Sequence, residues 1–396
     1  MSGNSQLALY VHLPWCVRKC PYCDFNSHQL KTAQPDSAYI DALLQDFELD
    51  RPLVAERRIY SVFFGGGTPS LFAPEDFARL LQALRQRIAF TNDAEITLEA
   101  NPGTIERGRF AGYAQAGINR VSLGAQTFAP QTLKLLGRIH TPQDTLRAVD
   151  ELRAAGLHNF NIDLMYALPQ QGIDAALADI KIVCELQPAH ISYYQLTLEP
   201  GTVFHARPPV LPDEELAWQI QTESQRLLAA AGYEQYEISA YAKSGARCRH
   251  NLNYWLFGDY LGLGAGAHGK LTHHLPQGIM RTTKPKQPRE YQARVEERAA
   301  QAGSRAQAER PAQVVGERRY IPPKELPFEF MLNALRLNEG FATRDFETRT
   351  GLPAIAIQPT VERAVARGLM EAGEAGWRAT SLGLRFLNDL QMSFLE

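Results

Sequence analysis

An alternation of short β-type runs and longer amphipathic segments extends from residue 7 to about residue 242, and it restricts the fold more than any other feature. The β-type runs end in glycine, proline or polar residues. The segments between them place apolar residues every three or four positions, as amphipathic helices do. Repeated β-α units of this kind build a parallel sheet. Predicted strands span 7–14, 58–66, 95–102, 120–126, 159–169 and 190–200, with helices that include 74–88, 141–156 and 213–232.

Six such units in succession predict an α/β fold with a full or partial (β/α) barrel, and a doubly wound open sheet is the alternative. We assign the barrel core to residues 1–242. Residues 243–320 follow as a connecting region, in which 281–320 holds twice as many basic as acidic residues and predicts a solvated helix plus linker. Residues 321–396 read as helices around a short hairpin within 368–390, which predicts a small α+β winged-helix-like module.

The composition limits the class of protein. The chain has 396 residues, of which 45% are hydrophobic, so it can bury at least one large core. A formal net charge of −2 argues against nucleic acid as a partner. No signal-peptide pattern and no run of roughly 18 to 20 apolar residues is present. An odd count of 5 cysteines is typical of a reduced compartment, so we expect a cytoplasmic protein.

Three of the cysteines form a C-x3-C-x2-C motif directly after the first predicted strand, at Cys16, Cys20 and Cys23. Three thiolates on one loop can hold a [4Fe–4S] cluster and leave one iron free for another ligand. A structural zinc site with His12 or His28 as fourth ligand is the alternative. The motif lies in a strand-to-helix loop, where (β/α) barrels place their chemistry, and this position favours the iron–sulfur site.

Several short motifs together resemble the oxygen-independent coproporphyrinogen oxidase family of the radical S-adenosylmethionine (SAM) superfamily. They occur in the family's order over roughly residues 7 to 200. The resemblance implies that the free iron of the cluster binds the methionine amine and carboxylate of SAM. The motifs are YVHLPWC at 10–16, GGGTP at 65–69, EANP at 99–102, GAQ at 124–126, LGR at 136–138 and NIDLMYALP at 161–169.

The resemblance also implies a set of SAM-binding residues. Glu99 and Asp163 stand late in predicted strands, so their carboxylates should project near the barrel mouth. The glycines of GGGTP lack side chains, so backbone groups there can approach a zwitterionic ligand. The implied contacts are Tyr10, Tyr22, Gly66, Gly67, Thr68, Glu99, Gln126, Arg138 and Asp163.

Two departures from the oxidases point to one branch of the family. Phe25 stands where the oxidases carry a fourth cysteine, and the segment before Tyr10 is short. Both resemble the HemW-type branch, whose members are regarded as haem chaperones. A third sign is an H-N-x-x-Y-W motif at 250–255, preceded by Cys248, which resembles the motif associated with haem binding in that branch.

This motif supplies groups suited to haem. His250 offers an imidazole and Cys248 a thiolate for the iron, while Tyr254 and Trp255 offer flat faces for the macrocycle. His268 is either a further ligand or a packing residue. Cys184 lies inside a helical pattern and is expected in the core.

The sequence therefore predicts a HemW-type haem chaperone that binds a [4Fe–4S] cluster, SAM and haem and passes haem to an acceptor protein, for example of the respiratory chain. Oxidative decarboxylation of coproporphyrinogen III to protoporphyrinogen IX is the enzymatic alternative. A zinc-stabilised docking protein is a third. We also expect peripheral membrane contact through the basic region, and either a monomer or a cluster-dependent homodimer.

Overall fold

The computed structural model describes residues 6–32, 35–54, 56–103, 108–273, 278–302, 315–374 and 376–395. Consecutive parallel strands form the centre of its main sheet, and each pairs with the next one along the chain. All six predicted strands are confirmed. They are β1 (Gln6–Leu13), β4 (Arg58–Gly66), β5 (Ala89–Ala100), β6 (Arg120–Gln126), β7 (Phe160–Tyr166) and β8 (His190–Gln195).

The main sheet is a partial barrel rather than a closed one. Strand β11 (Tyr260–Leu263) extends it in parallel beside β1, and β12 (His268–Thr272), β13 (Ile279–Thr283) and β14 (Glu317–Tyr320) follow in antiparallel pairing. At the opposite edge, β10 (Ala240–Ala242) and β9 (Glu234–Glu237) complete a 12-stranded sheet. Across β1 to β8 the strand order does not reverse, which excludes the doubly wound alternative.

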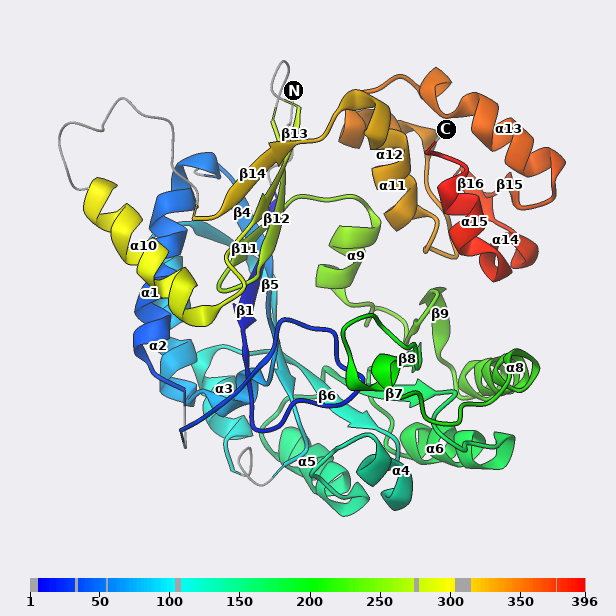
Figure 1. Ribbon diagram of the computed structural model, residues 1–396, viewed down its shortest axis with the longest axis horizontal. Coiled ribbons are helices and arrows are strands. Elements are labelled where there is room, and N and C mark those ends of the chain that lie inside the picture. The colour runs from blue at the N-terminus through cyan, green and yellow to red at the C-terminus, as the bar shows by residue number, and fades with distance from the viewer. Residues whose placement is uncertain are drawn as a thin grey trace.

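Helices cover the outer face of the parallel strands (Figure 1). The start of helix α5 is explained by its sequence, because Thr141 and Asp144 form a reciprocal capping box and Pro142 occupies the first turn. Its apolar face then packs into the large core between helices and sheet. The covering helices are α1 (Ala38–Asp50), α2 (Pro74–Arg85), α3 (Phe110–Ala116), α4 (Pro130–Leu135), α5 (Pro142–Ala154), α6 (Ile173–Glu185) and α8 (Glu214–Ala230).

The region 281–320 differs from the prediction of a solvated helix plus linker. Its helix exists as α10 (Pro288–Ala302), but Tyr291 is fully buried against the core and strands flank the helix. Lys284 is buried too, with its Nζ 2.5 Å from Asp46 and 2.6 Å from Asp50 of α1. The basic run looked solvated because its counter-charges lie far away in sequence. Residues 303–314 of this region lie outside the described residues, so the linker part of the prediction is not tested.

The C-terminal part has a hydrophobic core of its own and confirms the winged-helix-like prediction. Phe330 lies at its centre, with ring contacts to Phe341 and Phe346. No helix in the described part of the chain is long and apolar enough to cross a membrane. The elements are α11 (Leu326–Ala334), α12 (Thr343–Thr350), α13 (Gln358–Ala366), β15 (Met370–Ala372), β16 (Trp377–Ala379), α14 (Ser381–Arg385) and α15 (Leu387–Met392).

Helix α9 (Arg249–Trp255) carries the H-N-x-x-Y-W motif. It lies inside the curve of the sheet, between the barrel strands and the C-terminal module (Figure 1). Its position brings a motif from the connecting region to the interior of the barrel.

Candidate functional site

A cavity of about 380 Å³ opens where the parallel strands end. This is the edge at which (β/α) barrels place their active sites. It brings together almost all of the residues that the sequence predicts for the cluster and for SAM. Those lining it are Cys16, Cys20, Tyr22, Cys23, Gly66, Gly67, Thr68, Glu99, Gln126, Arg138 and Asp163.

The cysteine loop is held against the glycine motif by backbone contacts. The Gly67 N–H donates to Leu13 O at 2.9 Å, and the Thr68 N–H donates to Trp15 O at 2.7 Å. A Cβ at Gly67 would lie 2.5 Å from Trp15 O, and Gly66 has φ +113° with the His12 ring 2.4 Å from where its Cβ would stand. These glycines are therefore required first for packing against the cysteine loop.

The three thiols lie beside a half-buried cation, Arg138. Burial raises the pKa of Cys16 and of Cys23. Arg138 lies with Nη1 3.8 Å from Cys20 Sγ. Three soft sulfur donors and a half-buried guanidinium fit an anionic iron–sulfur cluster. Within the described ranges, no set of three or more His, Cys, Asp and Glu side chains is arranged to hold one metal ion.

His12 does not present a free nitrogen to the cysteines. Its Nε2 donates to Asn26 O at 2.8 Å, so its Nδ1 accepts from Tyr10 Oη at 3.0 Å. Both ring nitrogens are used inside the protein. This pairing disfavours His12 as the fourth ligand of a zinc site.

Two carboxylates share the inner wall of the cavity. Burial and the nearby charge of Asp163 raise the pKa of Glu99 to about 8, against the opposing effect of the Gly66 N–H, which donates to its Oε2 at 3.1 Å. Burial likewise raises the pKa of Asp163, although Ser122 and Asn161 donate to its oxygens at 3.0 and 2.7 Å. A cationic group placed here would favour ionisation of both acids.

The remaining predicted SAM residues differ in how many hydrogen bonds they already make within the protein. Arg138 Nη2 donates to Asn101 Oδ1 at 2.5 Å and to Gly124 O at 2.6 Å. Gln126 adopts φ 68°, in the left-handed region that non-glycine residues seldom occupy. Tyr10 does not line the main cavity; it stands behind Glu99, at a smaller cavity deeper in the barrel.

That inner cavity has a volume of about 170 Å³ and lies against α9. His250 lines it but is only 1% exposed. Its Nδ1 shares a hydrogen bond with Ser61 Oγ and its Nε2 with Tyr254 Oη, both at 3.1 Å. Its ring also stacks on Phe63, with centroids 5.1 Å apart. As placed, His250 offers no free nitrogen.

Cys248 and Trp255, the other predicted haem contacts, do not line either cavity. Cys248 is fully buried, with Sγ 3.7 Å from Glu95 Oε1. Trp255 lies under the Arg336 guanidinium, 4.1 Å from the ring centroid. Cys184 is half-buried against the main core, as expected.

Sequence reasoning missed the residues that fix α9. At its N-terminus, Glu95 of β5 accepts from the N–H groups of Arg249 and His250, each at 3.1 Å. Arg120 of β6 is fully buried nearby, and the charges of Cys248 and Glu95 raise its pKa against the effect of burial. The available signal was a charged residue at the start of each of the predicted strands 95–102 and 120–126. Such residues must be paired when they are buried.

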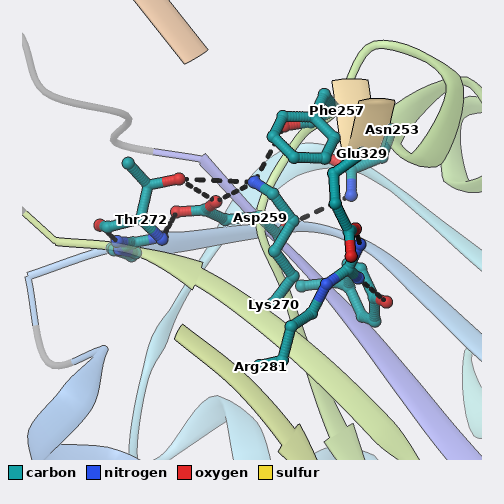
Figure 2. A network of polar contacts seen from close by, with 9 residues as sticks. Asn253, Phe257, Asp259, Lys270, Thr272, Arg281 and Glu329 are labelled. Atoms are coloured by element: carbon teal, nitrogen blue, oxygen red, sulfur yellow. Dashed lines mark hydrogen bonds and ion pairs between the residues drawn. The ribbon is translucent and has the colours of Figure 1, made fainter. Parts of the chain in front are cut away.

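At the C-terminal end of α9, a second buried network holds the chain (Figure 2). Lys270 Nζ donates to Phe257 O and to Asp259 Oδ1, both at 2.9 Å, while Asn253 Nδ2 donates to Asp259 O at 3.1 Å. Burial alone would raise the pKa of Asp259, but Lys270 and Arg57 hold it well below its usual range. Helix α9 is thus held at its N-terminus by the Glu95 carboxylate and at its C-terminal end by the Asn253 amide, next to the buried Lys270–Asp259 pair.

The sequence matches two family models. Residues 10–181 match the model described as the radical SAM superfamily, and residues 321–386 match the HemN C-terminal domain. The first covers the cysteine motif and the parallel strands from β1 to β7, and the second covers most of the C-terminal module.

Similar proteins match over nearly the whole chain. "Heme chaperone HemW" of Escherichia coli (strain K12) is 46% identical over 390 residues, covering 98% of both chains. "Heme chaperone HemW" of Haemophilus influenzae is 45% identical, again over 98% of both chains. The mitochondrial "Radical S-adenosyl methionine domain-containing protein 1" of Bos taurus is 34% identical, over 100% of this chain and 88% of its own.

Among solved structures, coproporphyrinogen III oxidase (HemN) from Escherichia coli, described as a radical SAM enzyme, superposes with a TM-score of 0.79. The match covers 99% of this chain and 90% of that one at 22% identity. It shows a common fold, including the partial barrel and the C-terminal module.

Proposed function

This chain belongs to the HemW family of the radical SAM superfamily, and from that premise we propose that it is a haem chaperone that holds a [4Fe–4S] cluster and SAM and delivers haem to an acceptor protein. The observation that carries the proposal is the 46% identity to a named haem chaperone over 98% of both chains. The geometry of the main cavity supports it, since the residues for cluster and SAM lie together there.

In this proposal each residue of the mouth has a definite task. Cys16, Cys20 and Cys23 bind three irons of the cluster, and when bound it supplies an open iron position and one-electron chemistry. Arg138 offsets the negative charge of the sulfur ligands. Glu99 and Asp163 accept hydrogen bonds from the ammonium and hydroxyl groups of SAM.

The burial and packing of the mouth residues also affect how SAM binds. The pKa of Glu99 is about 8 in the free chain, so this residue gives up its proton when a cation arrives beside it. The close packing of Gly66 and Gly67 on the cysteine loop leaves no room for added side chains. SAM recognition would therefore depend on a correctly folded cysteine loop.

We place the same protein in the cytoplasm, with peripheral contact to a membrane and an acceptor among respiratory-chain proteins. A monomer and a cluster-dependent homodimer both remain part of the proposal. The division into 1–242, 243–320 and 321–396 also stays a prediction.

Anaerobic purification followed by haemin titration tests the proposed function. We expect roughly four irons and four sulfides per chain, and a shifted Soret band on addition of haemin. The Cys20→Ala variant should lose the iron and sulfide. A haemin spectrum unchanged by the wild-type protein would refute the chaperone.

The same preparation tests the enzymatic alternative. Protein supplied with SAM, a reductant and coproporphyrinogen III should form no protoporphyrinogen IX. Appearance of that product would replace the chaperone with an oxidase. Zinc in place of iron and sulfide would instead support the docking protein.

A further inference from the structure

A second open cavity lies beside the main one and contains a histidine that the proposed mechanism does not use. This groove has a volume of about 400 Å³. One wall is the cysteine loop at Phe25 and Asn26, and the opposite wall is formed by Gly266, His268 and Lys286 around strand β12. Tyr254 of α9 and Tyr260 of β11 also line it.

The state of its histidine distinguishes the groove from the inner cavity. His268 is exposed at the start of β12. Its Nδ1 has a single contact, with Thr283 Oγ1 at 3.5 Å, and within the described residues its Nε2 has no hydrogen-bond partner. Burial and the charges of Arg281 and Lys286 lower its pKa, so the ring is neutral at neutral pH. A neutral imidazole with one free nitrogen is the form that binds iron.

The volumes of the two cavities also favour the groove over the inner cavity as a ligand site. Pockets for small-molecule ligands and cofactors have volumes of about 300 to 1,000 Å³. The inner cavity at His250, about 170 Å³, is below that range, whereas the groove at His268, about 400 Å³, falls within it. A haem at His250 would require α9 to leave its buried anchors at Glu95 and Asp259.

The groove combines aromatic side chains, which suit a flat apolar ring, with charged groups, since Asp24 and Glu99 line it as well as Lys286. The Tyr254 and Tyr260 rings pack edge to face, with centroids 4.6 Å apart. Phe25 is 60% exposed at the rim, an unusual state for a phenylalanine unless something covers it. Lys286 is an exposed cation on the opposite wall and can pair with a carboxylate.

The groove is also built onto the cysteine loop. Asn26 Nδ2 donates to Ala265 O and to Lys286 O, both at 2.9 Å. A Cβ at Gly266 would stand 2.4 Å from that Nδ2, so the two walls meet closely. Gly66 and Glu99 line both the groove and the main cavity, so a ligand in the groove would lie next to bound SAM.

We propose that haem binds in this groove with its iron on His268 Nε2, its ring beside Phe25, Tyr254 and Tyr260, and a propionate on Lys286. This site rests on the proposed chaperone function and gives it a specific location. The H-N-x-x-Y-W helix contributes through Tyr254 as part of the wall, while His250 holds that tyrosine in place.

Haemin titration of matched histidine variants tests the proposal. His268→Ala should weaken haemin binding at least about tenfold and remove the spectroscopic signature of histidine ligation, because the iron loses its protein ligand. Free imidazole should restore that signature in the His268→Ala protein. The exposed His158→Ala serves as the control and should keep histidine ligation.

The outcomes separate the site from the function. If wild-type protein does not bind haemin, the chaperone proposal fails. If wild type binds, and His268→Ala keeps the wild-type spectrum while His250→Gln loses it, the function stands and the groove is refuted. Thermal melting of each variant shows whether a loss of haemin binding reflects unfolding. In folded His268→Ala, recovery of the histidine-type spectrum with free imidazole then tests the site directly.

The propionate contact has its own test. Lys286→Glu should weaken haemin binding about three- to tenfold, whereas Lys181→Glu on the outer helix α6 should not change it. The dimethyl ester of haemin has no free carboxylates, so it should bind Lys286→Glu and wild type equally. An equal loss with haemin and with the ester would contradict the propionate assignment.

Discussion

The mouth of the barrel and helix α9 contain the same kinds of polar side chain, but those at the mouth line an open cavity whereas Glu95, His250 and Asp259 at α9 are buried. At α9, the carboxylates of Glu95 and Asp259 and both nitrogens of His250 are engaged within the protein. At the mouth and in the adjoining groove, the cysteine thiols and His268 Nε2 line open cavities. A residue type in a motif therefore indicates a ligand only where an atom remains free for it.

The largest expected effect concerns the buried anchor at the C-terminal end of α9. Asp259→Ala leaves Lys270 and Arg57 without their counter-charge and should destabilise the protein by about 3–5 kcal/mol. Urea unfolding of the apoprotein measures this. Asp93→Ala, which removes the exposed partner of Arg249, is the matched control and should leave stability unchanged. Equal stability of Asp259→Ala and wild type would show that the buried ion pairs of Asp259 with Arg57 and Lys270 do not stabilise the fold.

The next effect concerns the N-terminal end of the same helix. Glu95→Gln keeps an acceptor for only one of the Arg249 and His250 N–H groups, because an amide has a single oxygen, and it removes the charge opposite Arg120. We expect a loss of about 1–3 kcal/mol in the free energy of unfolding. Haemin binding at His268 should be kept once the variant is folded. If haemin binding fell while stability did not, α9 would have a direct role in binding.

Most of the fold was predictable because it depends on local pattern. The six parallel strands follow apolar runs, and α5 begins at its capping box. The grouping of the cluster and SAM residues at the mouth was predictable because the carboxyl ends of parallel strands lie at the same edge of the barrel. The burial of Lys284 was not, since its partners Asp46 and Asp50 precede it by more than 200 residues. The state of His250 depended in the same way on Ser61, which no local pattern connects to it.

A smaller effect at the mouth should depend on pH. Glu99 titrates at about 8 in the folded chain against 4.5 as its ordinary value, so between these pH values the folded chain retains a proton that the unfolded chain has released. Its contribution to apoprotein stability is complete below about pH 4.5 and is lost as the pH rises through 8. Glu99→Gln should flatten this part of the stability profile, measured by urea unfolding at each pH.

The same titration predicts proton release on SAM binding. A cation beside Glu99 favours its carboxylate, so binding near pH 7 should release up to about one proton. Calorimetry in two buffers of different ionisation enthalpy measures the number. Glu99→Gln should release fewer protons, and an unchanged number would place the titrating group elsewhere.

The smallest effect on stability should come from the residue with the largest effect on the metal. Cys20 lines the main cavity and is only half-buried, with Arg138 at 3.8 Å as its hydrogen-bond contact. Cys20→Ala should therefore change apoprotein stability by no more than about 0.5 kcal/mol, while the iron and sulfide content falls to background. Asp259→Ala, once folded at low temperature, should instead retain the cluster. Cluster loss should also affect the groove. Asn26 belongs to the cysteine loop and forms a wall of the groove, so cluster loss in Cys20→Ala should weaken haemin binding at His268. Undiminished haemin affinity in that variant would show that the groove forms without the cluster.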